Sequence, residues 1–170
     1  RVLFRSTSAA IGAIPTYTTG STLIRVAGLV WTTYQWDASS NALVLRDRLT
    51  GTTTTVGNNI VLFKAYYGKD ASGTGNVNAY DQTTPTTASG WKAVRTIRVM
   101  VVARSSQREK TAVTTANPTV DVGTATTMSG TSTCGTSKCL TLQISPTSGT
   151  DTEWQHYRYK VFDTVVPLRN

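Results

Sequence analysis

The segment WKAVRTIRVMVVARS, residues 91–105, constrains the fold of this chain more than any other. It is rich in β-branched residues and contains neither Gly nor Pro, a composition that favours an extended strand. The side chains of a strand alternate between the two faces of its sheet. Lys92, Arg98 and Arg104 all occupy even positions, while the odd positions include a set of apolar residues, namely Ala93, Ile97, Val99, Val101 and Ala103. The segment therefore predicts a long strand whose apolar and basic side chains are separated by face.

Further strands are predicted on both sides of this segment. LVWTTYQWD (29–37) and ALVLRDRL (42–49) flank the turn signal SSN and predict a hairpin. After the threonine-rich stretch 51–59, which we interpret as a turn, IVLFKAYYG (60–68) is apolar and aromatic and is expected to form a strand. Near the C-terminus, KCLTLQI (138–144) predicts a short strand and residues 157–166 a final one.

Two long polar segments separate these strands. Residues 69–90 are expected to form a polar loop that is too long for a simple turn, and residues 106–155 are mostly of low complexity. The absence of a repeated strand–helix alternation argues against a parallel sheet. We expect an α+β or mostly β domain spanning residues 1–170, with an antiparallel sheet and long loops.

The chain is basic, with 17 Lys and Arg against 9 Asp and Glu and a net charge of +8. A basic balance is compatible with nucleic acid, anionic lipid or an acidic partner, but these charges are dispersed. Tyr157-Arg158-Tyr159-Lys160 is the one place where rings and cations alternate. A period of two puts the rings on one face of a strand and the cations on the other. A half-buried strand is thus favoured, and Arg158 and Lys160 are kept as candidate nucleic-acid contacts.

The end of this strand shows an irregular pattern. Phe162 shares the even face with Arg158 and Lys160, so it is either exposed or moved inward by a β-bulge. Asp163 lies on the apolar face and points to the same irregularity.

The two cysteines, Cys134 and Cys139, lie in CGTSKC. A structural zinc site needs four ligands, and the spacing differs from the C-x-x-C of thiol oxidoreductases. A disulfide that closes a short loop is therefore expected, which indicates an oxidising compartment.

Residues 70–81 have the spacing of a calcium-binding loop, which makes them a candidate cation site. Asp70, Ser72 and Thr74 occupy the first, third and fifth positions of a calcium loop, but Asp70 is the only carboxylate among them and the twelfth position is Asp81 rather than Glu. We therefore expect no calcium here, and no metal or cofactor elsewhere in the chain.

The sequence offers little for catalysis. His156 is the only histidine, and no nucleophile motif, phosphate-binding loop or zinc-protease motif accompanies it. We expect a protein that is not an enzyme. No apolar stretch reaches the length of a membrane span, and no signal peptide is evident at residue 1.

Three segments in order, GNNIVLFKAYYGKDASGTGNV, WKAVRTIRVMVVARSSQREK and HYRYKVFDTVVPLRN, resemble the C-terminal half of PilW-type minor pilins of bacterial type IV pili. The resemblance covers about residues 29–170 and extends more distantly to J-type minor pseudopilins of type II secretion. It implies a pilin-like α+β fold in which an antiparallel sheet packs against a long N-terminal helix. Neither that helix nor a prepilin leader is present, so the chain is expected to be the soluble globular part, with membrane contact only through the missing helix.

The resemblance also implies a function. PilW-type subunits are minor pilins that act with other minor pilins to prime pilus assembly and cap the pilus, often with a large PilY-type adhesin. Such a subunit contacts the major pilin, lies in the inner membrane and periplasm before assembly, and then lies at the tip of the extracellular pilus. The candidate interface residues are Trp154, Phe162, Pro167, Leu168 and Arg169. DNA capture for uptake, or an unrelated extracellular β-rich adhesin, are the alternatives.

Overall fold

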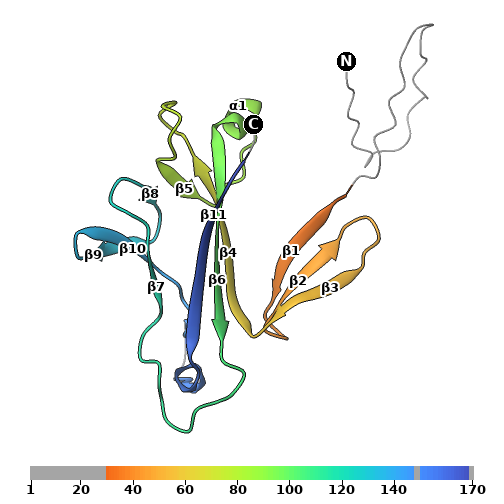
Figure 1. Cartoon of the computed structure of the whole chain (residues 1–170), viewed down its shortest axis with the longest axis vertical. Coiled ribbons are helices and arrows are strands. Elements are labelled where there is room, and N and C mark those ends of the chain that lie inside the picture. Colours follow the sequence, from red (N-terminus) through yellow and green to blue (C-terminus); the bar gives the residue numbers. More distant parts are fainter. Residues whose placement is uncertain (1–29, 148–149, 169–170) are drawn as a thin grey trace, which may run out of the picture. The chain divides into compact units, whose positions relative to one another are not determined.

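The computed structural model describes residues 30–147 and 150–168 of the chain. Almost all of the regular structure is antiparallel β-sheet, as the sequence predicts, and the strands form three sheets (Figure 1). The residues from Trp31 onward group into one compact unit.

The central sheet has five strands in the order β11-β6-β4-β5-β8. Its strands are β4 (Ile60–Lys69), β5 (Ala79–Asp81), β6 (Val94–Arg104), β8 (Thr127–Met128) and β11 (Tyr159–Pro167). Neighbours pair antiparallel except β5 and β8, which run parallel. The predicted strands at 60–68, 91–105 and 157–166 are thus confirmed as β4, β6 and β11, and they lie side by side although far apart in sequence (Figure 1).

A second sheet has the order β1-β2-β3, with β1 at Thr32–Asp37, β2 at Ala42–Asp47 and β3 at Thr53–Asn58. The hairpin predicted from the first two segments is confirmed. The prediction of a turn over 51–59 is wrong, because most of that stretch is β3. Thr54 and Thr55 pair with Leu45 and Val44 of β2, where β-branched side chains suit a pleated surface. Within this stretch, Gly51 and Thr52 belong to the turn between β2 and β3, and Asn59, whose φ of 58° is tolerated by Asn, connects β3 to β4.

The third sheet, β7-β10-β9, comes from the segment that we predicted to be of low complexity. β7 spans Thr119–Asp121, β9 spans Thr131–Cys134 and β10 spans Ser137–Thr141. β10 ends earlier than the predicted strand 138–144. Two apolar residues of this segment explain why it folds. Val120 of β7 and Leu140 of β10 are buried against the central sheet.

Helical structure is sparse. α1 (Ala88–Ala93) lies where a loop and the start of a strand were predicted, so Trp91 to Ala93 are helical rather than extended. Thr87 explains the start of α1, because its hydroxyl accepts the backbone N–H of Gly90. A short 3₁₀ helix, η1, spans Glu153–His156. None of the helices in the described part of the chain has the length and hydropathy of a membrane span.

The core lies between the central sheet and the third sheet. Met100 and Val102 of β6 are fully buried there, and both are at even positions, on the same face as the basic residues. The cluster consists of Leu62, Tyr66, Tyr80, Met100, Val102, Val120, Val122, Met128, Leu140 and Leu142. Gly68 is required beside this cluster, because a Cβ there would collide with Thr96 and lie 2.8 Å from the ring of Tyr80.

Candidate functional site

The central sheet has two unlike faces, which the register of β4, β6 and β11 defines. Residues directly opposite one another in an antiparallel pair point to the same face. Even positions of β6, such as Met100 and Val102, lie on the face that covers the core, which we call the inner face. Odd positions of β6 lie on the other side, which we call the outer face.

The inner face carries an ion pair at its edge. Arg98 of β6 is only 8% exposed, and its guanidinium donates to both carboxylate oxygens of Asp163 on β11, at 2.9 Å from Nε and 2.6 Å from Nη2. A third hydrogen bond, from Nη2 to the carbonyl of Asp121, is 3.1 Å long. Asp163 is thus on the inner face because it neutralises a buried arginine. The β-bulge that the sequence left open as one of two alternatives for Phe162 is absent, since the register of β11 with β6 runs unbroken from Tyr159 to Pro167.

The outer face is mostly apolar. Phe63 and Phe162 flank Val101 of β6, and the neighbouring pairs repeat this apolar pattern. Its apolar members in the three strands are Phe63, Ala65, Tyr67, Ile97, Val99, Val101, Ala103, Phe162 and Val166, and Arg95, Lys160 and Thr164 are its polar members. The buried core of the described residues contains none of them. An apolar sheet face that is not part of the core is typical of a surface that packs against another element or another chain.

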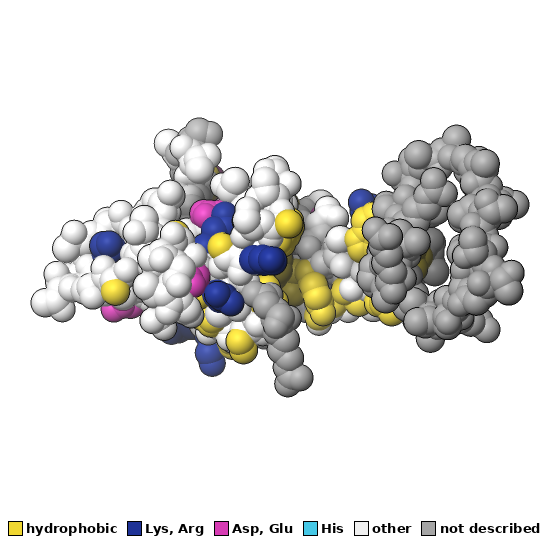
Figure 2. Space-filling model, turned by 90° about the horizontal axis from the view of Figure 1, so that it is seen from above, with side chains coloured by type: hydrophobic (Ala, Val, Ile, Leu, Met, Phe, Trp, Pro, Cys, Tyr) yellow, Lys and Arg dark blue, Asp and Glu magenta, His cyan; other side chains and the backbone are white. Residues whose placement is uncertain are grey.

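The exposed large hydrophobic side chains of the outer face lie on β11. Phe162 is 51% exposed and Val166 48%, whereas Phe63 and Val101 are half-buried. Of the two placements that the sequence left open for Phe162, the structure has the exposed one. Seen from above, hydrophobic side chains reach the surface beside Lys and Arg side chains (Figure 2).

The structure separates the other candidate interface residues. Pro167 and Leu168 continue β11 and are exposed, and the N–H of Leu168 donates to the carbonyl of Arg95. Trp154 lies in η1 and is half-buried, away from the outer face, where its carbonyl accepts the hydroxyl of Tyr159 at 2.8 Å. Arg169 lies outside the described residues. Phe162 and Pro167 thus lie on opposite faces of β11, Leu168 directly follows the strand, and Trp154 lies in a different element.

Trp154 instead borders an aromatic cleft that the sequence did not reveal. The cleft has a volume of about 520 Å³, and Trp36, Tyr157 and Arg104 are among its lining residues. The guanidinium carbon of Arg104 lies 4.4 Å from the centre of the Tyr157 ring. Because Trp36 is more than a hundred residues from Trp154 in the chain, only the tertiary fold brings these rings together.

The two candidate nucleic-acid contacts are both exposed but differ in their partners. Arg158 donates to Glu109 at 2.9 Å, so its charge is matched locally. The amine of Lys160 lies 5.3 Å from the ring centre of Phe162, on the outer face. Tyr159 points the other way, as the period of two predicts, and contacts the core. No pair of clustered cations results from this arrangement of Arg158 and Lys160.

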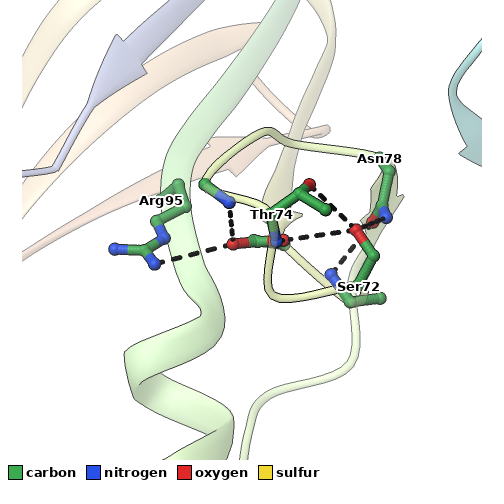
Figure 3. A network of polar contacts seen from close by, with 7 residues as sticks. Ser72, Thr74, Asn78 and Arg95 are labelled. Atoms are coloured by element: carbon green, nitrogen blue, oxygen red, sulfur yellow. Dashed lines mark hydrogen bonds and ion pairs between the residues drawn. The ribbon is translucent and has the colours of Figure 1, made fainter.

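The loop after β4 is organised by a buried carboxylate. Asp70 accepts the backbone N–H groups of Thr74 at 3.0 Å and Gly75 at 2.8 Å, and Arg95 lies 3.5 Å away. Arg95 approaches from β6 while Ser72, Thr74 and Asn78 border the loop (Figure 3). The N–H of Gly75, followed by that of Thr74, lowers the pKa of Asp70 against the opposing effect of burial.

This arrangement bears on the weak cation candidates. The oxygens of Asp70 already accept hydrogen bonds, and the hydroxyls of Ser72 and Thr74 lie 3.1 Å apart in contact with each other. Within the described residues, no three His, Cys, Asp or Glu side chains are grouped to share a metal ion. That calcium does not bind here stays a prediction, which is taken up in the Discussion.

The predicted disulfide is present. Cys134 and Cys139 are joined across the hairpin of β9 and β10. Gly135, at a φ of 62°, makes the turn between these two strands.

Comparison with known proteins identifies the family. The sequence model of PilW, described as Type IV Pilus-assembly protein W, matches residues 29–170. The chain belongs to the PilW family. No curated protein and no solved structure gives a significant match.

Membership of the PilW family gives the fold a biological setting. PilW proteins take part in type IV pilus assembly, and they are a structural rather than an enzymatic class. The family also associates the chain with the periplasm and the pilus, and with other pilus-assembly components. The β-rich domain with one apolar outer face is consistent with a part that works by association.

Proposed function

We propose that this PilW protein is a non-enzymatic minor pilin that primes assembly of the type IV pilus and caps it through contacts with other minor pilins. The observation that supports this proposal is the outer face of the central sheet. Its apolar side chains lie outside the core, and on β11 two of them, Phe162 and Val166, are about half exposed. Leaving such side chains in water is unfavourable, at roughly 25 cal/mol per Å² of apolar surface.

The outer face has the chemistry of a packing surface for pilin subunits. A β-sheet with one apolar face buries that face against a helix or another sheet. An apolar helix of a pilin is the occupant implied by the resemblance, with Phe162 and Val166 at the border of the contact. In the proposed mechanism, burial of this face drives association, while the chain itself changes no covalent bond.

The proposal extends to partners and location. Other minor pilins and the major pilin are the proposed neighbours, with a PilY-type adhesin at the same end of the pilus. The protein would reside in the inner membrane and periplasm before assembly and at the pilus tip afterwards.

A charge placed on the outer face tests the proposal. Val166→Asp puts a carboxylate on this face, and Val56→Asp on β3 is the matched control because Val56 is exposed to a similar extent, 54% against 48%. Each variant is expressed from the full-length gene in a strain that lacks it, and surface pili are counted by electron microscopy. We expect loss of pili with Val166→Asp and normal numbers with Val56→Asp, with equal denaturant midpoints for both purified proteins. Normal piliation with Val166→Asp would overturn the role of the outer face.

DNA capture and an unrelated adhesin role stay as alternatives. A strain lacking the gene that keeps normal pilus numbers but loses DNA uptake would favour the former. Normal pili with a loss of surface attachment alone would favour the latter.

A further inference from the structure

β11 forms one edge of the central sheet, and half of its backbone groups point away from β6. The N–H of Ser105 donates to the carbonyl of Arg158, and the N–H of Leu168 donates to the carbonyl of Arg95. In an antiparallel pair, residues that exchange backbone hydrogen bonds alternate with residues that do not. The even positions of β11 therefore bond to β6, and the odd positions direct their N–H and C=O groups outward. These outward positions are Tyr159, Val161, Asp163, Val165 and Pro167.

Two further observations agree with this assignment. Pro167, which lacks an N–H, falls at an odd position, where no bond to β6 is lost. Counted over all its atoms, Asp163 is exposed, but its side chain alone is only 26% exposed. Its backbone is therefore open to solvent. Among the described strands, β6 is the one neighbour of β11.

The edge has few of the features that keep sheet edges apart. Proteins usually shorten an edge strand, bulge it, place charges on it or cover it. β11 is 9 residues long, its register is unbroken, and its last six residues are all exposed. Of its two charged side chains, Asp163 is neutralised by Arg98, which leaves Lys160. Pro167 blocks only the end of the edge.

We propose that the outer edge of β11 binds an extended segment of a different pilus-assembly chain, which adds to the central sheet as a further strand. The outward N–H and C=O groups of Tyr159, Val161, Asp163 and Val165 supply the backbone hydrogen bonds. The added strand extends the outer face beside Phe162 and Val166, so the residues that it places there are apolar. The uncompensated amine of Lys160 selects a carboxylate at the corresponding end of the segment. This inference rests on the proposed role in pilus assembly and specifies how one partner is held.

A second copy of this chain is a poorer occupant than a different chain. Each copy carries a net charge of +8, so two copies repel one another, most strongly at low salt. An acidic or neutral segment lacks this penalty.

A peptide of matching chemistry provides the direct probe. The peptide acetyl-Val-Thr-Val-Thr-Val-Thr-Glu-amide, added antiparallel to β11, places its valines and its one carboxylate on the same face, with the carboxylate at the Lys160 end, and the control peptide has Lys in place of Glu. Amide hydrogen exchange of the purified chain is measured by NMR with each peptide, and affinity is measured by titration. We expect the acidic peptide to protect the amides of Tyr159, Val161, Asp163 and Val165, with a Kd on the order of 100 µM.

Backbone substitution separates edge pairing from side-chain contact. Val165→Pro removes an outward N–H without removing a hydrogen bond to β6, whereas Val165→Ala shortens the side chain and keeps the N–H. We expect Val165→Pro to weaken peptide binding by about tenfold or more and Val165→Ala by only about twofold. Lys160→Glu is the variant that leaves the backbone intact. It should reverse the preference, so that the Lys peptide binds more tightly than the Glu peptide.

The outcomes decide the proposal. No protection of these four amides at about 1 mM acidic peptide would overturn it, as would equal binding by the Val165→Pro and Val165→Ala proteins. Self-association on sedimentation that Val165→Pro abolishes would replace the proposed occupant with a second copy. Failure of the peptide to bind while Val166→Asp still abolishes pili would reject the edge proposal and leave the proposed function intact. Peptide binding together with normal piliation in the Val166→Asp strain would support the edge proposal and reject the role of the outer face in pilus assembly.

Discussion

Arg98 and Asp163 lie on neighbouring strands and form a bidentate ion pair, with the arginine 8% exposed. The pair links the side chains of β6 and β11, two paired strands that are separated in the sequence by more than fifty residues. A buried guanidinium without a partner is costly, so Asp163 fixes which face of β11 turns toward the core. That choice places Phe162 and Val166 on the outer face, where the proposed function needs them.

Asp163→Asn is expected to destabilise the protein. The substitution keeps the shape of the side chain but leaves the buried charge of Arg98 uncompensated, which should lower the free energy of unfolding by about 2 kcal/mol. Urea denaturation of the purified chain measures this change. The matched control is Glu153→Gln in the exposed pair with Arg108, whose side chains are 45% and 59% exposed, and it should cost less than about 0.5 kcal/mol. Equal losses in the two variants would contradict the structural role of Arg98 and Asp163.

Acid should destabilise the protein through Asp70. Its pKa in the folded state lies below the ordinary value, chiefly because of the N–H of Gly75. A carboxyl with a lowered folded pKa contributes stability above its unfolded pKa of about 3.9, and this contribution is lost as the pH falls through the folded value. Urea midpoints should therefore change little from pH 7 to pH 5 and fall below about pH 4. Asp70→Asn should be less stable at pH 7 and show a shallower acid decline, and parallel curves for the two proteins would argue against this assignment.

The disulfide should make a modest contribution. Cys134 and Cys139 are separated by 5 positions, and a loop of this size stabilises by about 2 kcal/mol in the chain-entropy description. For a chain of this length, the double variant Cys134→Ser/Cys139→Ser should melt about 4–8 °C lower than the wild type. Calorimetry with and without reductant checks this. Reductant should lower the Tm of the wild type but not that of the double variant, and a fall in both would show that the reductant acts elsewhere.

Calcium should leave the stability unchanged. To bind the ion at Asp70, the loop would have to give up the hydrogen bonds from Thr74 and Gly75 and accommodate Arg95 nearby. The Tm measured with calcium should therefore equal the Tm measured with a chelator, with magnesium as the control ion. A rise in Tm that calcium causes and magnesium does not would establish a site in residues 70–81.

Duplex DNA should bind weakly. The charge of Arg158 is matched by Glu109, which leaves Lys160 as the free cation of the pair suggested by the sequence. Fluorescence anisotropy at two salt concentrations is the measurement, because contacts with phosphates weaken steeply as salt rises. We expect no saturable binding at the higher concentration. Tight binding there that Lys160→Glu removes would favour the DNA-capture alternative.

The strands of the central sheet could be predicted because their signals are local. The β-branched and aromatic runs of β4, β6 and β11 identify strands whatever surrounds them. The threonine run of β3 has the sequence of a turn, because it is a polar stretch with Gly at either end, and only its pairing with β2 makes it extended. Short strands such as β7 and β9 gave no signal of their own, since Val120 and its neighbours acquire a role only against the central sheet.

The candidate site could be predicted in part. The two-residue period of β11 predicts that even and odd side chains lie on opposite faces of the strand. Exposure of Phe162 is one of the two placements that the sequence allows. The assignment of Asp163 to a bulge failed because the reason for its position, Arg98, lies 65 residues away. The surroundings of Trp154 could not be predicted either, because the rings near it come from distant segments.

By itself, the sequence determined that this chain is a β-rich PilW-type domain with a short disulfide loop and a strand at its C-terminal end. Those features rest on side-chain shape, two-residue periodicity and cysteine spacing, which act within a few residues. The tertiary structure decided which face of that strand is buried, and that β6 is its one paired neighbour among the described strands. Both depend on contacts between β6 and β11, and a long-range pairing of this kind leaves no trace in either segment alone.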